Sequence, residues 1–518
     1  MTQQISTADA AALMASDDLF ALFDVRERGE YNEFQIANST SLPRSQIELR
    51  VGELVPNRKV PIVVYDEGGR RAELAANTLT ELGYGDVAVL QGGLDAWRRE
   101  NREAVSGVNV PSKAFGERVQ HERNVPDLSP QELKALLDST SDLAILDVRT
   151  PEEYGRFCIP GGINVPGGDL ILWAEELRQK PAVIVNCAGR TRSIIAAAAL
   201  RRLGLDNVRA LRNGTMGWVL AGYELEPKPA RRGAAPPRNA QALAAALQIA
   251  ADEKLAWTTA DQAALAIANA TGGVNYLIDV RGEAEFAAGH IAGSINVPGG
   301  QAVQRADDFV PVRSGRIVFV SNKSARAVMA AYWYRQMGFK NVSALRGGIE
   351  AWRASGRQLA AGAAIPEPLG FDIAMRSARF IDGAQLQKLI GDGSSLLLDV
   401  STSLEHERAH VPGARWISRG WIDLKLPELF PDRTRKIVLI CADGRQSVFA
   451  ARQLAQVGYP EVLILDGGMR RWTAAGLETA LGLEGALMPV NDVVLSPSIR
   501  GSKEDMLNYL NWELNLKH

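Results

Sequence analysis

The residues best suited to nucleophilic chemistry are three cysteines in a chain of 518 residues, Cys158, Cys187 and Cys441. None belongs to a Cys-x-x-Cys pair, and three are too few for a disulfide framework. The five histidines are scattered singly, so the sequence indicates no metal site and no cofactor. Each cysteine is therefore a candidate for either packing or sulfur chemistry.

Two of the cysteines open short loops that also contain glycine, arginine and serine. The loops run from Cys187 through Gly189, Arg190 and Arg192 to Ser193, and from Cys441 through Gly444 and Arg445 to Ser447. Each loop follows an apolar segment of strand length and leads into a predicted helix. Backbone N–H groups and the helix dipole would then surround the sulfur with positive potential. We expect a lowered thiol pKa, a partly ionised cysteine and attraction of an anion by the arginines.

These loops belong to a motif that occurs four times along the chain. Each copy has an apolar strand ending in Asp-Val, a second apolar strand, the loop, a helix, a third strand and a tryptophan. The aspartates are Asp24, Asp147, Asp279 and Asp399, and the tryptophans are Trp97, Trp218, Trp352 and Trp472. The separation between the first loop residue and the tryptophan is identical in all four copies, which indicates tandem duplication.

Alternation of strands and helices in units of this size predicts an α/β fold. Each copy should form a mainly parallel sheet with helices on both faces. The sequence predicts the start of one helix directly. Ser129 can cap the helix, Pro130 suits its first position and Glu132 completes a capping box. We expect four domains and a tail, at residues 1–104, 105–232, 233–362, 363–484 and 485–518.

The tail contains Leu507, Leu510 and Leu514 at helical spacing, with Met506 and Trp512 beside them. This pattern predicts a helix docked on a neighbouring domain, and a partner-binding peptide is the alternative.

Composition limits the partners of the chain. The formal net charge is -2 and the pI is near 6.3, which favours neither nucleic acid nor an anionic membrane. The first residues lack a basic start followed by an apolar run, and no apolar stretch is long enough to span a membrane. We therefore expect a cytoplasmic protein; the oligomeric state stays open.

The motifs together resemble those of the rhodanese (thiosulfate sulfurtransferase) superfamily. The resemblance rests on the two cysteine loops, the Asp-Val-Arg strand ends, the Gly-His-Ile-Ala-Gly stretch at 289–293 and the Gly-Gly-x-x-x-Trp stretch at 347–352. It implies four tandem rhodanese-like domains and a cysteine that accepts a sulfane sulfur, becomes a persulfide and passes the sulfur to cyanide or a thiol. That catalytic role carries over to Cys187 and Cys441.

The resemblance also suggests which residues bind the donor. They are the loop residues Gly189, Arg190, Arg192, Ser193, Gly444, Arg445 and Ser447. Arginine-rich loops suit the thiosulfate dianion. Because Cys187 has two loop arginines, whereas Arg445 is offset by Asp443, we expect Cys187 to accept sulfur from thiosulfate faster.

The other two copies have Asp66 and Ser321 at the cysteine position. A carboxylate there would repel an anionic donor, and the serine has no evident base, so we expect both copies to be inactive and to serve as scaffold. Cys158 occupies the position of Gln35, His290 and His410 in the other copies. This variety indicates a structural residue; a resolving partner for Cys187 is the alternative.

Three other functions compete with thiosulfate sulfur transfer. Cysteine phosphatases have a Cys-x5-Arg loop, whereas Cys187 to Arg192 is Cys-x4-Arg, a shorter ring that suits a single sulfur atom better. A mercaptopyruvate enzyme would have a loop resembling Cys-Gly-[Ser/Ala]-Gly-Val-Thr, which is absent. A non-catalytic scaffold that binds sulfur-carrying partners agrees with the two loops without cysteine.

Overall fold

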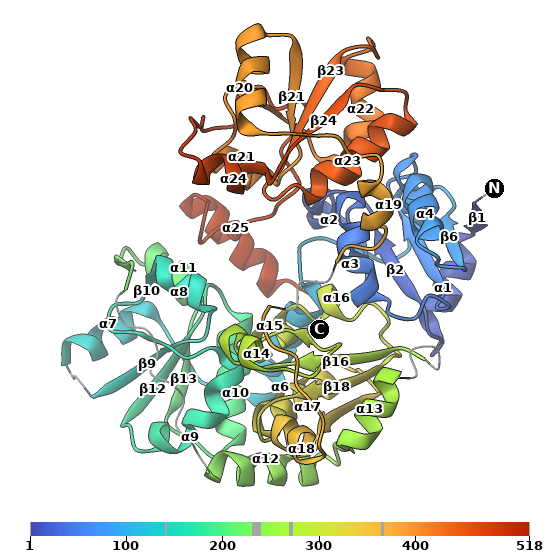
Figure 1. Cartoon of the computed structure of the whole chain (residues 1–518). Helices are drawn as coiled ribbons and strands as arrows, with labels where there is room; N and C mark the ends of the chain where they lie inside the picture. Colours follow the sequence, from blue (N-terminus) through green and yellow to red (C-terminus); the bar gives the residue numbers. More distant parts are fainter. Residues whose placement is uncertain (1, 140–141, 230–239, 269–272, 364–366, 517–518) are drawn as a thin grey trace. The chain divides into compact units, whose positions relative to one another are not determined.

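The computed structural model describes residues 2–139, 142–229, 240–268, 273–363 and 367–516. Within them each repeat forms a five-stranded sheet whose neighbouring strands are all parallel (Figure 1). Taken in chain order, the strands of every sheet are arranged first, fifth, fourth, second, third. The predicted α/β class with parallel sheets is confirmed.

The strand bounds show how closely the repeats match. In the first repeat they are β1 (Gln3–Ile5), β2 (Ala21–Asp24), β4 (Thr40–Ser41), β5 (Ile62–Tyr65) and β6 (Val87–Leu90); in the second, β8 (Asp127–Leu128), β9 (Leu143–Asp147), β11 (Ile163–Asn164), β12 (Ala182–Asn186) and β13 (Val208–Leu211). In the third they are β15 (Ala256–Thr258), β16 (Asn275–Asp279), β17 (Ile295–Asn296), β18 (Arg316–Val320) and β19 (Val342–Leu345); in the fourth, β20 (Phe380–Ile381), β21 (Ser395–Asp399), β22 (Arg415–Trp416), β23 (Lys436–Ile440) and β24 (Val462–Leu465).

The fourth strand of each sheet leads into the candidate loop. It lies at the centre of the sheet, and its apolar residues are buried because helices cover both faces. The helices that begin at the ends of these loops are α4 (Arg71–Glu81), α10 (Thr191–Arg202), α17 (Ala325–Gln336) and α23 (Arg445–Gln456). The ends of parallel strands thus place all four loops at corresponding edges of their sheets.

Two local predictions can be checked directly. The predicted capping box is present, since the Ser129 N–H donates to Glu132 and the Glu132 N–H donates to Ser129 Oγ. The predicted helix in the tail is α25 (Lys503–Leu514). Its buried face differs from the leucine stripe, because Leu507 and Leu514 are exposed whereas Leu510 and Glu513 are buried. A carboxylate takes the place expected for a leucine because the helix lies against a polar loop, described below.

The repeats assemble in a nested order. The first compact unit contains the first and fourth repeats, Met1–Ser16, Ala21–Val108 and Pro366–Val494. The second unit contains the second and third repeats and the tail helix, Asp17–Phe20, Asn109–Ile365 and Leu495–His518. Each unit therefore combines one repeat that has a loop cysteine with one that has none. The domain limits drawn from the sequence stay a prediction.

Both units have contacts between their two repeats. In the first unit, Arg44 of η1 (Arg44–Gln46) forms an ion pair with Asp423 at 2.7 Å, and Arg419 of η3 (Arg419–Trp421) forms one with Glu48 at 2.6 Å. In the second unit, glycine backbones approach closely, since a Cβ at Gly168 would lie 2.8 Å from the Cα of Gly299.

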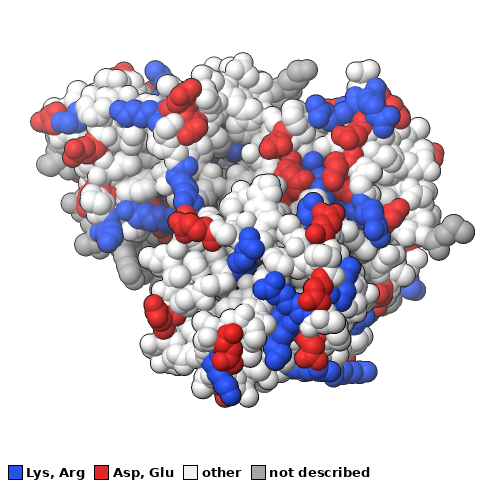
Figure 2. All heavy atoms as spheres, turned by 90° about the horizontal axis from the view of Figure 1, so that it is seen from above, with Lys and Arg blue, Asp and Glu red and all other residues white. Residues whose placement is uncertain are grey.

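No helix in the described residues is long and apolar enough to cross a membrane. On the face drawn in Figure 2, the positive and negative side chains of the described residues are interspersed. This distribution agrees with the small net charge of the sequence.

Candidate functional site

Backbone hydrogen bonds connect each cysteine loop to the helix that carries the recurring tryptophan of the same repeat. The N–H of Thr215 in α11 (Gly214–Leu220) donates to the Cys187 carbonyl at 2.9 Å, and Met469 in α24 (Gly468–Ala474) donates to Cys441 in the same way at 2.9 Å. A Cβ at Gly214 would lie 2.2 Å from the Cys187 carbonyl oxygen. A side chain at position 214 would clash with this carbonyl, so the close contact requires glycine there.

The Cys187 sulfur is enclosed by its own loop. The residue is 2% exposed, and its Sγ lies 3.5 Å from the hydroxyl of Ser193. That hydroxyl also donates to the Arg190 carbonyl at 2.8 Å, which closes the loop. Cys187 and Ser193 are therefore brought together as the sequence predicts.

The Cys441 sulfur accepts a backbone hydrogen bond. The N–H of Gly444 donates to its Sγ at 3.1 Å, and the residue is 1% exposed. Burial raises the pKa of the Cys441 thiol, against the opposing hydrogen bonds of Ser447, Asp443 and Gly444. The expectation of a lowered pKa is wrong for Cys441, because the cost of burying a thiolate exceeds the gain from the N–H groups.

The loop of the first repeat holds a carboxylate at the position of the cysteines. One oxygen of the buried Asp66 carboxylate accepts the N–H groups of Gly68 at 2.8 Å and Gly69 at 3.0 Å, and the other accepts that of Ala72 at 3.0 Å. In the third repeat, Ser321 Oγ accepts the N–H of Ala327 at 3.2 Å. Backbone N–H groups thus donate to the first side chain in the loops of the first, third and fourth repeats, and in the first they hold an anion.

The loop arginines do not project into this ring as free charges. Arg190 makes two hydrogen bonds to Glu117, at 2.6 and 2.7 Å, and Arg192 makes two to Glu153, at 2.6 and 2.8 Å. Arg192 has equivalents in the first and third repeats, where Arg71 binds Glu30 and Arg326 binds Glu285. The predicted electrostatic advantage of Cys187 assumed that the arginines point into the pocket; each is paired with a glutamate, and the ranking of the two cysteines stays a prediction.

Arg445 differs from the two arginines beside Cys187. Its side chain is 35% exposed and lies 3.6 Å from Asp443, a looser ion pair than those of Arg190 and Arg192. The sequence predicted this offset by Asp443 correctly.

Two helices outside the repeat pattern contact the Cys187 loop. Gly116 of α6 (Val110–Arg123) lies so close that a Cβ would be 2.9 Å from Thr191. On α25, Glu513 accepts a hydrogen bond from the Thr191 hydroxyl, and a Cβ at Gly189 would lie 3.5 Å from the Tyr509 ring. The docking predicted for the tail helix is confirmed, but no pattern in the sequence indicated that its target is a cysteine loop.

Cys158 lies in a different part of the second repeat. It belongs to β10 (Phe157–Cys158), which pairs with β14 (Glu226–Pro227), and the equivalents Gln35, His290 and His410 make matching antiparallel contacts. Burial, helped by the negative charge of Glu226, raises the pKa of Cys158 to about 11. These contacts support its structural role.

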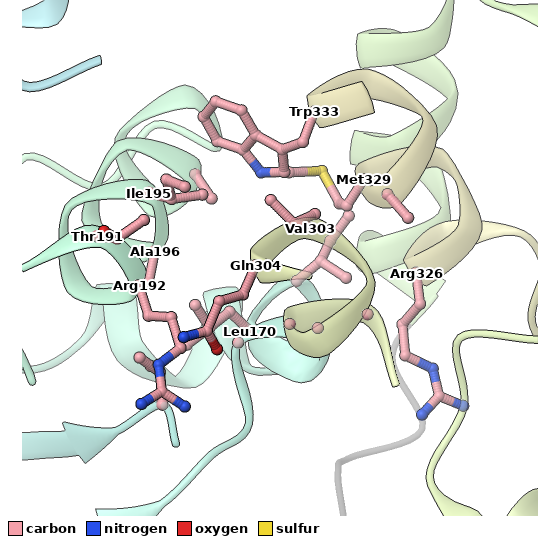
Figure 3. A pocket seen from close by; sticks show the side chains of 18 of the residues that line it. Leu170, Thr191, Arg192, Ile195, Ala196, Val303, Gln304, Arg326, Met329 and Trp333 are labelled. Carbon is pink, nitrogen blue, oxygen red and sulfur yellow. The ribbon is translucent and has the colours of Figure 1, made fainter. Parts of the chain in front are cut away.

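A pocket lies beside α10, between the second and third repeats of the same unit (Figure 3). Its lining includes the apolar side chains of Leu170, Ile195, Val303, Met329 and Trp333. Figure 3 shows the guanidinium groups of Arg192 and Arg326 pointing away from Trp333. Cys187 does not line the pocket, and the described residues contain no cluster of metal-ligating side chains.

Comparison with known proteins agrees with this geometry. The rhodanese-like domain family matches residues 6–100, 129–221, 259–355 and 382–475. The crystal structure of a thiosulfate sulfurtransferase from Pseudomonas aeruginosa is similar with a TM-score of 0.91 and 38% identity, covering 99% of this chain and 97% of that one.

Two curated bacterial proteins are similar over shorter stretches. Thiosulfate sulfurtransferase of Azotobacter vinelandii is 32% identical over 153 residues, which are 29% of this chain and 55% of that protein. A sulfurtransferase of Allochromatium vinosum is 30% identical over 101 residues, 20% of this chain and 94% of that protein. With four matched segments and a similar structure along its whole length, the chain belongs to the rhodanese-like domain family of sulfurtransferases.

Proposed function

We propose that the protein transfers a sulfane sulfur from thiosulfate to cyanide or a thiol, through persulfides on Cys187 and Cys441. The observation that carries the proposal is the Asp66 carboxylate, held by three backbone N–H groups at the position of the cysteines. The same ring around a cysteine would hold the outer, negatively charged sulfur of a persulfide. Similarity to thiosulfate sulfurtransferases supports the choice of donor.

The reaction needs no group beyond the cysteine and the N–H ring. The Sγ thiolate attacks the outer sulfur of thiosulfate, the S–S bond of thiosulfate breaks, and its electron pair leaves with sulfite. Cyanide then attacks the outer sulfur of the persulfide, so that thiocyanate forms and the cysteine thiolate returns. Both steps conserve charge and need no external oxidant.

The repeats with Asp66 and Ser321 would act as scaffold in this proposal. Each belongs to the same compact unit as one cysteine repeat, so its surface supports that repeat. The proposal also places the protein in the cytoplasm, where unpaired cysteines stay reduced.

Cysteine variants test the proposal. Cys187→Ser and Cys441→Ser should each remove part of the thiosulfate:cyanide activity, and the double variant should remove all of it. Mass spectrometry after incubation with thiosulfate should find one added sulfur on each of the two cysteines. Full activity in the double variant would refute the assignment.

A non-catalytic scaffold for sulfur-carrying partners is the second candidate, and the two loops without cysteine favour it locally. The same mass measurement separates the two functions, because a scaffold would acquire no sulfur on either cysteine.

A further inference from the structure

The Cys187 loop has a carboxylate from the tail helix against it. Glu513 is 1% exposed, and its Oε1 accepts the Thr191 hydroxyl. Its Oε2 has no hydrogen-bond partner among the described residues and lies 3.1 Å from the position of a Cβ at Gly189. A buried carboxylate oxygen aimed at a loop glycine is costly, which indicates a functional reason for its retention.

Charged groups lie around Glu513. Lys113 of α6 lies against the rings of Tyr509 and Trp512, at 4.8 and 4.5 Å from their centroids. Arg190 faces the same cluster and binds Glu117 through Nε and Nη2. Burial raises the pKa of Glu513, against the opposing charge of Lys113 and the hydrogen bond from Thr191.

The carboxylate beside the Cys441 loop has a different origin. Gly189 corresponds to Asp443 by its place after the cysteine, and the Cβ position at Gly189 meets Met216, Glu513 and Tyr509. The carboxylate against the Cys187 loop thus comes from the tail helix, whereas Asp443 belongs to the Cys441 loop itself and lies 3.6 Å from Arg445.

We propose that Glu513 is a specificity-determining residue of the Cys187 site, which slows the reaction of Cys187 with dianionic thiosulfate relative to that with a less charged donor, a low-molecular-weight thiol persulfide. Repulsion from the carboxylate grows with the charge of the donor, so it weakens binding of thiosulfate more than that of a persulfide. The proposal rests on the function proposed above, in which Cys187 accepts sulfur.

The persulfide reaction is balanced like that of thiosulfate. The Cys187 thiolate attacks the outer sulfur of the donor persulfide, whose S–S bond breaks. The electron pair leaves on the donor's inner sulfur as a thiolate, and the outer sulfur stays on Cys187.

The test uses the full-length chain with one loop cysteine at a time. In the Cys441→Ser background, the rates of sulfur addition to Cys187 are measured by mass spectrometry with thiosulfate and with cysteamine persulfide, whose ammonium group offsets the charge of its persulfide. Glu513→Gln should raise the thiosulfate rate roughly tenfold and the persulfide rate much less. Glu504→Gln is the matched control, because it removes a charge from an exposed position of the same helix and should change neither rate.

Glu513→Asp separates charge from loosening of the helix. It keeps the charge and should keep the low thiosulfate rate, whereas a loosened α25 would speed the reaction in both Glu513 variants. Added salt should speed the thiosulfate reaction of the parent and not that of Glu513→Gln, because screening weakens repulsion.

The outcomes separate the two proposals. An equal thiosulfate-to-persulfide ratio in parent and Glu513→Gln, or a parallel increase in both Glu513 variants, overturns the specificity proposal while sulfur transfer stands. If neither donor adds sulfur to Cys187 or Cys441 in any variant, the proposed function itself fails.

Discussion

The loops of Cys187 and Cys441 share a backbone and differ in their surroundings. In both, the cysteine carbonyl accepts an N–H from the helix that starts with a glycine. The Cys187 loop lies against two helices from outside its repeat, α6 and α25. The Cys441 loop has Asp443 at the position of Gly189, and this carboxylate lies 3.6 Å from the partly exposed Arg445.

A second difference lies at the end of the neighbouring strand. Asp147 binds Arg149 with bonds of 2.7 to 3.1 Å, whereas Asp399 in the fourth repeat contacts Nδ1 of His406 at 2.8 Å. His406 in turn stacks on His410 with ring centroids 3.8 Å apart. Duplication has preserved the main-chain frame of the loop, and the side chains around it have diverged. Differences in donor preference must therefore come from those side chains.

The largest effect is expected from substitution of the glycine that packs against the cysteine carbonyl in each of the two loops. Gly214→Ala should slow sulfur addition to Cys187 roughly 100-fold, because a Cβ would clash with the Cys187 carbonyl and Gly214 has a φ of +53°. Gly468→Ala should do the same to Cys441, and each variant should leave the other cysteine unaffected. The measurement is the rate of persulfide formation on each cysteine by mass spectrometry.

Gly222→Ala and Gly476→Ala are the matched controls for these variants. Both glycines have positive φ values, of +88° and +68°, but nothing lies within 4 Å of their Cβ positions. Their substitution should cost stability without a change in persulfide formation. Equal losses in the controls would show that backbone strain, and not the carbonyl clash, disables the loop.

The next largest effect is expected from a buried carboxyl group of the first unit. Glu27 is buried in the first unit, where it accepts the Ser418 hydroxyl at 2.6 Å, and burial raises its pKa to about 7 from an ordinary value of 4.5. Because the folded state holds the proton more tightly than the unfolded chain, the stabilisation from Glu27 is complete below pH 4.5. It is lost as the pH rises through 7, by about 3 kcal/mol.

The comparison of Glu27→Gln with the parent isolates this group. Urea unfolding between pH 5 and 8 should show the parent losing stability relative to Glu27→Gln as the pH rises. Asp492, Glu30 and Arg71 also face Glu27. Glu33→Gln, an exposed change on α2 (Arg28–Glu33), should follow the parent. Parallel curves for Glu27→Gln and the parent would contradict the raised pKa.

A smaller effect distinguishes loops with and without cysteine. Asp66→Ala removes the acceptor for three N–H groups and should lower the free energy of unfolding by about 2 kcal/mol. Thiosulfate:cyanide turnover should stay almost unchanged, because Asp66 can hold no sulfane sulfur. Ser321→Ala, which removes one accepted hydrogen bond, should cost less and also leave turnover unchanged. A large loss of rate with the fold intact would show that these repeats take part in the chemistry.

The sequence predicted the elements of each repeat better than the contacts between them. The repeats, their parallel sheets, the loop positions and the helix start at Ser129 follow from local patterns that recur in register. The nested pairing of repeats does not, because it depends on side chains far apart along the chain, such as Arg419 and Glu48. A local pattern carries no information about such partners.

The candidate site was predictable to the same extent. The loop cysteines are identified by their position after a buried strand, but the charge around them is not. Arg190 is neutralised by Glu117 from the segment before the second repeat, and Glu513 arrives from the tail. The predicted leucine stripe did not indicate that α25 buries Glu513 against this loop.

The smallest expected effect concerns the third cysteine, which serves as the reference for the other two. Cys158 is fully buried in a strand pair, and its pKa of about 11 leaves very little thiolate at neutral pH. Cys158→Ala should therefore leave both sulfur transfer and the persulfide yields on Cys187 and Cys441 unchanged. Native Cys158 should also resist iodoacetamide at pH 7 until the protein is unfolded. A rise in the persulfide yield on Cys187 alone would instead identify Cys158 as its resolving partner, because a resolving thiolate attacks the inner sulfur of the persulfide, forms a disulfide with Cys187 and releases sulfide.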